Sequence, residues 1–451
     1  MNNNYGFLYN LVVLPFAAIF GNTLAVHRSI SILCVIISGA LIALTLMRVK
    51  TSSPFAFAGG SLVTACLLFN VTPLARPDAL GEFLFLAAIL LPWRRNFDRQ
   101  SLIPSALAGI CAFLAKPYFL LSIIIVATYI FVFVSKGRGL YYLLVAMLSL
   151  VVVLYITNSL FECYFLGAIL SNAGNSILSD SHMWEQLTRF IKIFLPCLIL
   201  LFLGSKTFIK RSHIMITEIF KKPGALDFIH PSQPLYRYAA NYFEFFLLSS
   251  TVVVAALLGK HIGAYMTYFF QLIAPGLILS LFQRRNLLQE RAALAAPLIL
   301  SNLLIICFGV LYPNKLSLSQ QRDWEGLYKF VADSDRILNS PILVAEMARL
   351  GRTPVDSGQS EYYFTTRSYS SNPFAPDYEK IVDQGNKYLK TNQSAIQNQE
   401  YDYIFIVLEA GPSPFIDSQF IDRRYDTIET IKVVMPQSGQ ECTVEVKAPK
   451  K

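Results

Sequence analysis

Charged side chains within long apolar stretches are the residues of this chain best suited to chemistry. Arg76, Asp78 and Glu82 come together in the segment 74–82. Proline is favoured at helix starts, so we expect a helix to begin near Pro77 with Asp78 in its first turn, where the helix dipole favours negative charge. Asp78 could therefore be a simple helix cap. Because a cap needs no second carboxylate one turn deeper, Asp78 and Glu82 together are candidates for a functional site.

Lysine 116 is a second candidate, since it lies between two short apolar segments in the sequence Ala-Lys-Pro-Tyr at 115–118. A lysine there could simply extend its ammonium group to the membrane interface. It could equally hold a phosphate as a point charge. The loop at 259–268 adds a further lysine and a histidine. The predicted binders of an anionic phosphate are therefore Arg76, Lys116, Lys260 and His261.

Tyrosines form a third group, both near the N-terminus and in the loop at 259–268. Tyrosines at a membrane interface are commonly anchoring residues. The close grouping of two of them with a lysine and a histidine makes that explanation less sufficient here. We therefore predict a substrate cavity lined by Tyr5, Tyr9, Asn10, Arg28, Tyr265 and Tyr268.

Long apolar helices must position these polar groups. The chain has 451 residues, of which 54% are hydrophobic and only 15% charged, whereas soluble domains carry about 25% charged residues. Apolar runs of about twenty residues, enough for a helix to cross a bilayer, recur up to residue 312. We predict a polytopic α-helical membrane domain at 1–312 with about ten transmembrane helices. The predicted spans are 27–48, 54–74, 78–93, 101–115, 117–135, 139–161, 189–206, 243–259, 264–283 and 293–312.

The stretch 7–20 is also apolar, but Gly6, Pro15 and Gly21 flank or interrupt it. We expect it to form an N-terminal helix lying along the membrane surface, with a true span as the alternative.

Orientation follows from the distribution of lysine and arginine, which are most abundant in cytoplasmic loops. One alternate set of loops, which includes 94–99 and 206–222, holds most of these residues. The N-terminus and the residues from 313 onward are then expected outside, together with the polar side chains at 5–28, 74–82, 115–118 and 259–268. An outward cavity of carboxylates, cations and tyrosines suits an anionic, membrane-borne substrate. The net charge of +9 arises largely from the cytoplasmic loops and requires no nucleic acid.

The segment 313–451 has the composition of a soluble domain. We expect helices at 320–333 and 377–389, and strands at 341–345, 403–407 and 428–435. Alternating strands and helices predict a small C-terminal soluble α/β domain. The sequence shows no glycine-rich phosphate loop, no internal repeat, and no metal-ligand spacing of cysteine or histidine.

Taken in order, these motifs resemble the GT-C superfamily of integral membrane glycosyltransferases, in particular the bacterial relatives of protein O-mannosyltransferases and the aminoarabinose transferase. The resemblance covers essentially the whole chain, and in many members an outward α/β tail follows the membrane domain. The matching segments are 5–9, 20–24 with Arg28, 76–80, 113–116 and 259–268.

The resemblance implies a hexosyltransferase of the bacterial inner membrane. A sugar on a polyprenyl-phosphate carrier enters from the bilayer and is transferred to a lipid, glycan or protein acceptor on the outer face. An acidic residue acts as general base on the acceptor hydroxyl, and cations stabilise the departing lipid phosphate, which suits Arg76 and Lys116. No cofactor is implied with certainty, and a divalent metal stays an open alternative.

The start of the sequence departs from this family pattern. Members begin with a transmembrane helix and an acidic outer loop before the segment that matches 5–9, whereas here no acidic residue precedes Asp78. We therefore expect either a start codon further upstream or a truncated, inactive chain. Asp78 and Glu82 are the nearest substitutes for the missing carboxylate.

Two other classes of protein compete with this hypothesis. A transporter or flippase for a lipid-linked saccharide would typically show internal repeats and helices broken near the midplane of the membrane. A non-catalytic membrane partner is the third hypothesis, which the missing acidic loop favours.

Overall fold

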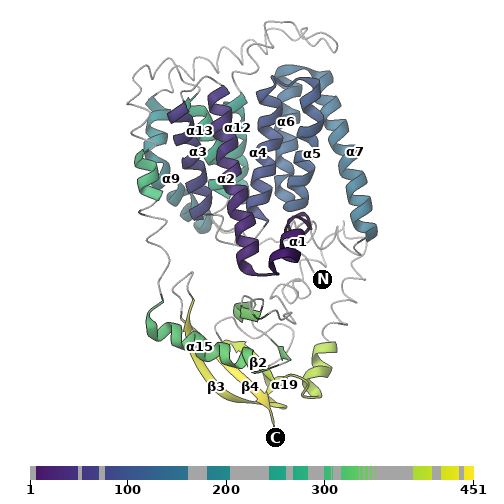
Figure 1. The fold of residues 1–451 in the computed structure, drawn as a ribbon, viewed down its shortest axis with the longest axis vertical. Coiled ribbons are helices and arrows are strands. Elements are labelled where there is room, and N and C mark those ends of the chain that lie inside the picture. Colours follow the sequence, from purple (N-terminus) through teal and green to yellow (C-terminus); the bar gives the residue numbers. More distant parts are fainter. Residues whose placement is uncertain are drawn as a thin grey trace.

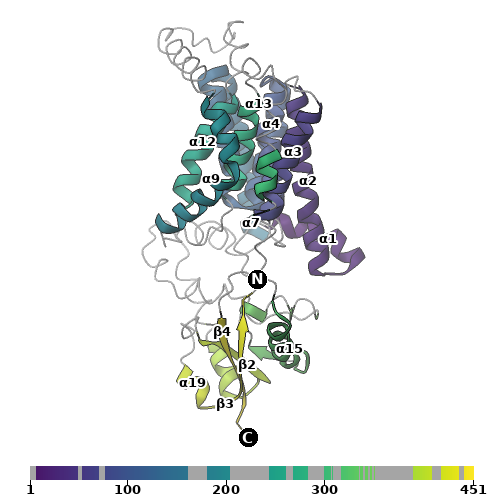
Figure 2. The ribbon, with the colours of Figure 1, turned by 90° about the vertical axis from the view of Figure 1, so that its left-hand side faces the viewer.

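The computed structural model consists mainly of helices, with a small mixed sheet near the C-terminus (Figure 1). Its helical bundle and its sheet-containing unit lie at opposite ends of the long axis in two perpendicular views (Figures 1 and 2). The structure describes residues 7–48, 53–70, 77–160, 180–203, 243–260, 268–282, 299–305, 307, 316–334, 336–338, 341–343, 346–347, 350, 387, 390–408, 418–435 and 441–450.

The first half of the bundle is a series of helices that follow one another closely in the sequence. They are α1 (Leu8–Phe20), α2 (Leu24–Arg48), α3 (Ser53–Asn70), α4 (Asp78–Arg94), α5 (Arg99–Ala115), the 3₁₀ turn η1 (Pro117–Leu120), α6 (Leu121–Tyr129), the π-helical segment η2 (Ile130–Val134) and α7 (Lys136–Leu160). Later in the chain follow α9 (Asp180–Leu203), α12 (Phe243–Leu258), the π-helical segment η4 (Phe269–Ile273) and α13 (Ala274–Phe282).

Three of these helical stretches are long and apolar enough to cross a membrane, namely 24–48, 117–134 and 136–160. Shorter apolar helices pack beside them. Many large apolar side chains on the outside of the bundle are exposed, among them Leu144 and Val151 of α7. Such a surface is typical of contact with lipid. The fold is therefore compatible with a helical membrane protein.

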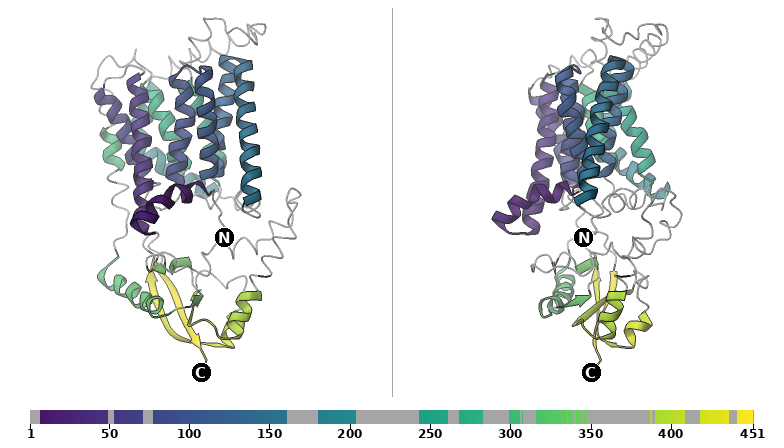
Figure 3. Two further views of the ribbon diagram at one scale, coloured as in Figure 1. Left: turned by 45° about the vertical axis from the view of Figure 1, so that its right-hand side comes forward. Right: turned by 90° about the vertical axis from the view of Figure 1, so that its right-hand side faces the viewer.

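The predicted N-terminal helix near 7–20 is present as α1, which packs against α2 and α5. It lies at an angle across the end of the bundle that faces the sheet-containing unit (Figures 1 and 3). Its buried side chains are Tyr9 and Val13, while Leu14 and Ile19 are exposed. Gly21 ends the helix with a φ of 85°, a conformation that glycine adopts without a steric penalty.

Helices α4 and α5 form a tight antiparallel pair that places the beginning of α4 next to the end of α5. At the other end of the pair, the Asp98 side chain caps α5 by accepting a hydrogen bond of 2.8 Å from the backbone amide of Ser101. Within the pair, the Ser105 hydroxyl donates to the carbonyl of Ala88 at 2.6 Å. These contacts fix the register of the two helices and therefore the positions of residues 78 and 116.

The C-terminal unit contains a four-stranded sheet in the order β1-β2-β4-β3, with α15 (Leu318–Ala332) among its helices. Its strands are β1 (Ile337–Leu338), β2 (Tyr403–Val407), β3 (Tyr425–Val434) and β4 (Glu441–Pro449), and the short helices η6 (Pro341–Leu343) and α19 (Ser418–Asp422) connect them. Only β1 and β2 are parallel among the described strands. The indole nitrogen of Trp324 on α15 donates to the Val434 carbonyl at 3.0 Å, which holds the helix on the sheet.

The sequence predictions for this unit were partly right. The helix at 320–333 and the strands at 403–407 and 428–435 are present as α15, β2 and β3. The strand predicted at 341–345 is wrong at its beginning, because 341–343 form a 3₁₀ turn. Proline has no amide hydrogen for a sheet ladder, so Pro341 favours a turn. Leu343, at the end of this turn, is buried in the core of the C-terminal unit. Most of the helix predicted at 377–389 falls outside the described residues.

Candidate functional site

The centre of the candidate site is an ion pair between Asp78 and Lys116. The Lys116 Nζ lies 2.6 Å from Asp78 Oδ1, and the two side chains are 16% and 5% exposed. A charge-assisted hydrogen bond of this length is among the stronger polar contacts in proteins. Removing one partner of a buried pair leaves the other charge uncompensated, which typically costs about 3–5 kcal/mol. Each residue therefore depends strongly on the other.

Local sequence explains why each of the two residues is positioned there. Helix α4 begins at Asp78 after Pro77, as predicted, and Pro77 at the N-cap makes no side-chain capping hydrogen bond. The carboxylate of Asp78 is bonded to Lys116 instead, which goes beyond the simple role of a helix cap. Lys116 itself is extended (φ −153°, ψ 127°), because Pro117 disfavours a helical conformation in the preceding residue and starts η1.

Glycine 81 allows these two segments to meet. A Cβ atom at Gly81 would lie 2.2 Å from Cε2 of the Phe119 ring, which is far inside van der Waals contact. Phe119 is fully buried and packs against Phe85 with a centroid distance of 5.6 Å. The absence of a side chain at Gly81 therefore lets η1 approach α4 closely.

Tyrosine 118 and Gln271 complete the site from a distant part of the chain. The Tyr118 hydroxyl donates a hydrogen bond to Gln271 Oε1, and Gln271 Nε2 donates to the carbonyl of Asp78 at 3.5 Å. The Lys116 ammonium lies 5.2 Å from the centre of the Tyr118 ring, within the range of a cation–π contact. Tyr268 packs edge-on against Tyr118 at 4.8 Å. Three segments of the chain thus meet around one lysine, namely the start of α4, residues 116–118 and residues 268–271.

Glutamate 82 lies one turn along α4 from Asp78 and is fully buried. Neither of its carboxylate oxygens has a hydrogen-bond partner among the described residues. A buried carboxylate without such a partner is costly, so residues of this kind are typical of functional sites. The two carboxylates predicted from the sequence are therefore neighbours on one helix, and only Asp78 of the two is paired with a lysine.

The other predicted phosphate binders are distributed differently. Lys260 forms an ion pair with Asp180 at 2.8 Å, and their side chains are 40% and 71% exposed. Beside it, the buried Gln186 donates to the carbonyl of Gly259 at 2.9 Å. Lys260 thus belongs to a separate ion pair with Asp180, which joins the end of α12 to the start of α9. Arg76 and His261 lie outside the described residues.

The predicted cavity-lining residues that the structure describes are not gathered in one place. Of the members that the structure describes, only Tyr268 contacts the ion-pair site, through Tyr118. The buried Tyr9 donates to the His27 carbonyl at 2.8 Å and contacts the Ser31 hydroxyl at 3.1 Å, so its hydroxyl attaches α1 to α2. Asn10 and Arg28 are exposed on these two helices. Tyr5 and Tyr265 lie outside the described residues.

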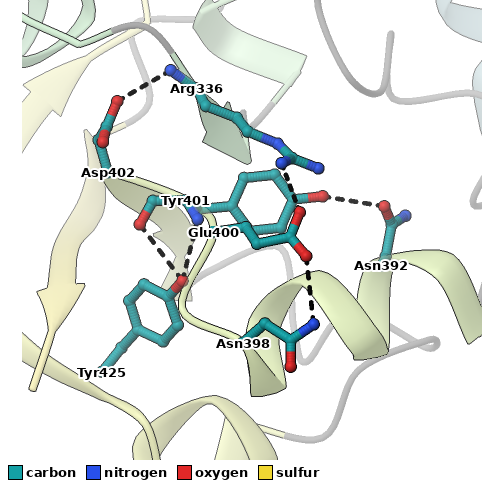
Figure 4. A network of polar contacts seen from close by, with 7 residues as sticks. All are labelled: Arg336, Asn392, Asn398, Glu400, Tyr401, Asp402 and Tyr425. Carbon is teal, nitrogen blue, oxygen red and sulfur yellow. Dashed lines mark hydrogen bonds and ion pairs between the residues drawn. The ribbon is translucent and has the colours of Figure 1, made fainter.

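A separate polar network in the C-terminal unit is a structural element (Figure 4). The Tyr425 hydroxyl accepts from the amide of Tyr401 and donates to its carbonyl, both at 3.2 Å. Arg336 pairs with Glu400, and its amide donates to Asp402 at 2.9 Å. Burial raises the pKa of both tyrosines. Because these groups satisfy one another, the network joins β1, β2 and β3 rather than presenting free groups to a ligand.

Chemically, the ion-pair site offers a cation, a carboxylate and a second buried carboxylate within two adjacent helices. A lysine held beside a tyrosine ring can bind an anionic oxygen, and the carboxylate released from it can accept a proton. Within the described part of the chain, no three His, Cys, Asp or Glu side chains are grouped as a metal site requires. Sequence reasoning had named Asp78, Glu82 and Lys116, but it missed Tyr118 as a member of the site and Gln271 altogether.

No protein family, curated protein or solved structure matches the chain. The fold itself defines a helical protein whose apolar helices are compatible with a membrane. The largely buried Asp78–Lys116 ion pair is its candidate site.

Proposed function

We propose that this protein is a glycosyltransferase that moves a sugar from a polyprenyl-phosphate carrier to an acceptor hydroxyl. The observation that carries the proposal is the largely buried pair of Lys116 and Asp78, in which a cation and a carboxylate lie 2.6 Å apart. Transfer of a sugar from a lipid phosphate needs both groups. The cation stabilises the phosphate as it leaves, and the carboxylate takes the proton of the attacking hydroxyl. The order of motifs that resembles the GT-C superfamily supports the same reaction.

In the proposed reaction, the lipid phosphate first competes with Asp78 for the ammonium of Lys116. Its arrival frees the Asp78 carboxylate, which then accepts the proton of the acceptor hydroxyl. The hydroxyl oxygen forms a bond to the anomeric carbon while the bond from that carbon to the phosphate oxygen breaks. The lipid phosphate leaves as an anion bound to Lys116. Glu82 supplies a second carboxylate one turn away on the same helix.

The finer membrane arrangement belongs to the same proposal. We infer about ten membrane-crossing segments, the number of long apolar runs in the sequence. The distribution of lysine and arginine favours a tail outside the cytoplasmic membrane of a bacterium. The side of the bundle that carries α1 is the side of the C-terminal unit (Figure 1). This shared side supports an acceptor that reaches the site from the compartment of the tail.

The test is to compare the lipids of cells with and without the gene by mass spectrometry. We expect one polyprenyl-phosphate-linked sugar to accumulate in the deletion strain. The intact gene and the Lys136→Gln variant should reverse this accumulation, whereas Lys116→Gln should not. Lys116 and Lys136 flank opposite ends of the helical stretch 117–134, so they form a matched pair. An unchanged set of lipid-linked sugars in the deletion strain would refute the transferase.

A second candidate function is transport of a lipid-linked saccharide, which the burial of Glu82 favours. Carboxylates inside a membrane domain are typical of proton-coupled transporters. The two functions differ in product. A transferase forms a new glycosidic bond in detergent solution with donor and acceptor present, whereas a transporter requires a sealed vesicle and leaves the lipid-linked sugar chemically unchanged.

A further inference from the structure

Gln271 is a polar side chain that joins Tyr118 to the start of α4 in the candidate site. It is fully buried within η4, among the apolar residues Phe270 and Leu272. Burying an amide without hydrogen bonds costs free energy, so its position in an apolar segment requires partners. Those partners are Tyr118 and the backbone of Asp78.

The two hydrogen bonds of Gln271 act on both members of the ion pair. Its oxygen accepts from the Tyr118 hydroxyl, and the ring of Tyr118 lies beside the Lys116 ammonium at 5.2 Å. Its nitrogen donates to the carbonyl of Asp78, at the first residue of α4. One amide therefore fixes the ring beside the cation and the backbone that carries the carboxylate.

The backbone around Gln271 also differs from a regular helix. Residues 269–273 form a π-helical segment directly before α13. Such segments are rare and occur frequently at functional sites, because the wider turn reorients a side chain. In this case the Gln271 side chain reaches the Tyr118 hydroxyl and the backbone carbonyl of Asp78 from a third helical segment.

We propose that Gln271 is a positioning residue that, through Tyr118 and the start of α4, sets the geometry in which Lys116 binds an anionic phosphate. This inference rests on the proposed function, in which the anion is the phosphate of a polyprenyl lipid. Loss of the amide allows Tyr118 to turn away and the start of α4 to shift. Phosphate affinity then falls while the fold persists.

The experiment measures binding of decaprenyl phosphate to the purified full-length chain in nanodiscs, with thermal unfolding recorded in parallel. The test variant is Gln271→Met, which keeps the length of the side chain. Gln186→Met is the matched control, since Gln186 is equally buried and also donates to a backbone carbonyl, that of Gly259. Tyr118→Phe removes the hydroxyl while keeping the ring.

We expect Gln271→Met to weaken binding roughly threefold to tenfold, the range that corresponds to one or two hydrogen bonds, and Gln186→Met to leave it unchanged. If Gln271 acts through Tyr118, the two changes are not independent. The double variant of Gln271→Met with Tyr118→Phe should then lose less affinity than the two single fold-losses multiplied together. Unchanged affinity in Gln271→Met, even with a lowered unfolding temperature, would overturn the positioning role and leave the transferase intact. Failure of the unaltered protein to bind the lipid phosphate would overturn both.

Discussion

The ammonium group of Lys116 lies 2.6 Å from the carboxylate of Asp78, although 38 positions separate the two residues in the chain. The contact joins the end of α5 to the beginning of α4. It also means that the cation best placed to bind a phosphate is already neutralised. An anionic ligand must compete with Asp78 for Lys116, so ligand binding and release of the carboxylate are coupled.

Replacing Lys116 should therefore have a specific effect on anion binding. We expect Lys116→Gln to weaken binding of decaprenyl phosphate by about a hundredfold, on the order of 2.7 kcal/mol, because the cation is lost and Asp78 then repels the anion. Binding to the full-length chain in nanodiscs is the measurement. Lys136→Gln, at the other end of the helical stretch 117–134, should bind as the unaltered protein does. Equal affinities in both variants would remove Lys116 from the site.

The close approach of η1 to α4 predicts a strong requirement for glycine at position 81. Gly81→Ala places a Cβ 2.2 Å from the buried ring of Phe119, and overpacking of this kind typically costs about 1–3 kcal/mol. Thermal unfolding of the full chain in detergent should therefore begin at a lower temperature.

Gly326→Ala is the matched control for that change. Gly326 lies inside α15, and nothing is within 4 Å of a Cβ added there. Alanine is favoured over glycine in a helix interior by roughly 1 kcal/mol, so this variant should not destabilise the protein. An unchanged unfolding temperature in Gly81→Ala would show that Phe119 can move aside.

The C-terminal unit should lose stability in alkaline solution. Burial raises the pKa of Tyr401 and Tyr425 above 10.0, so the unfolded chain releases these protons first and unfolding is favoured as pH rises above 10.0. Burial lowers the pKa of Lys447, but hydrogen bonds to Asp422 and Glu445 outweigh it and raise the pKa above 10.5. The stabilisation from Lys447 is complete below pH 10.5 and is lost as pH rises through its folded-state pKa.

Fluorescence of Trp324 can measure this loss. The chain has three tryptophans, so Trp93→Phe with Trp184→Phe leaves only the reporter on α15. Denaturant unfolding should show a lower midpoint at pH 11 than at pH 8. Adding Tyr401→Phe and Tyr425→Phe should flatten this dependence on pH, even though the variant is less stable at both values. An equally steep dependence in that variant would assign the effect to other groups.

Helix positions could be predicted well from the sequence where an apolar run met a strong local signal. The start of α4 follows from Pro77, and the break before η1 follows from Pro117. Strand β2 was found because it is a short, continuous apolar run. Strand β4 was missed because the strand predictions rested on continuous apolar runs. Its buried residues Cys442, Val444 and Val446 alternate with polar ones, a period-two pattern that is also typical of a half-buried strand.

The composition of the site was harder to predict. The charges at 78, 82 and 116 stand out because charge is expensive inside an apolar helix. Gln271 gave the same signal, a polar residue within an apolar run, but it carries no charge and lies 153 positions after Tyr118. Hydrophobic periodicity gives the buried face of a helix, but not the helix that packs against it. For that reason the sequence also grouped Lys260 with Lys116, whereas Lys260 pairs with Asp180.

The most direct test of the account compares Asp78→Asn with Lys116→Gln in two assays, decaprenyl phosphate binding and sugar transfer. Asparagine at 78 removes the carboxylate that competes for Lys116, so we expect binding to tighten about tenfold, on the order of 1.4 kcal/mol, while transfer is lost. Lys116→Gln should lose both. Opposite changes in affinity with a common loss of transfer are the predicted result. Weaker binding in Asp78→Asn, or normal transfer by it, would contradict the claim that phosphate displaces Asp78 from Lys116 and frees it as the base.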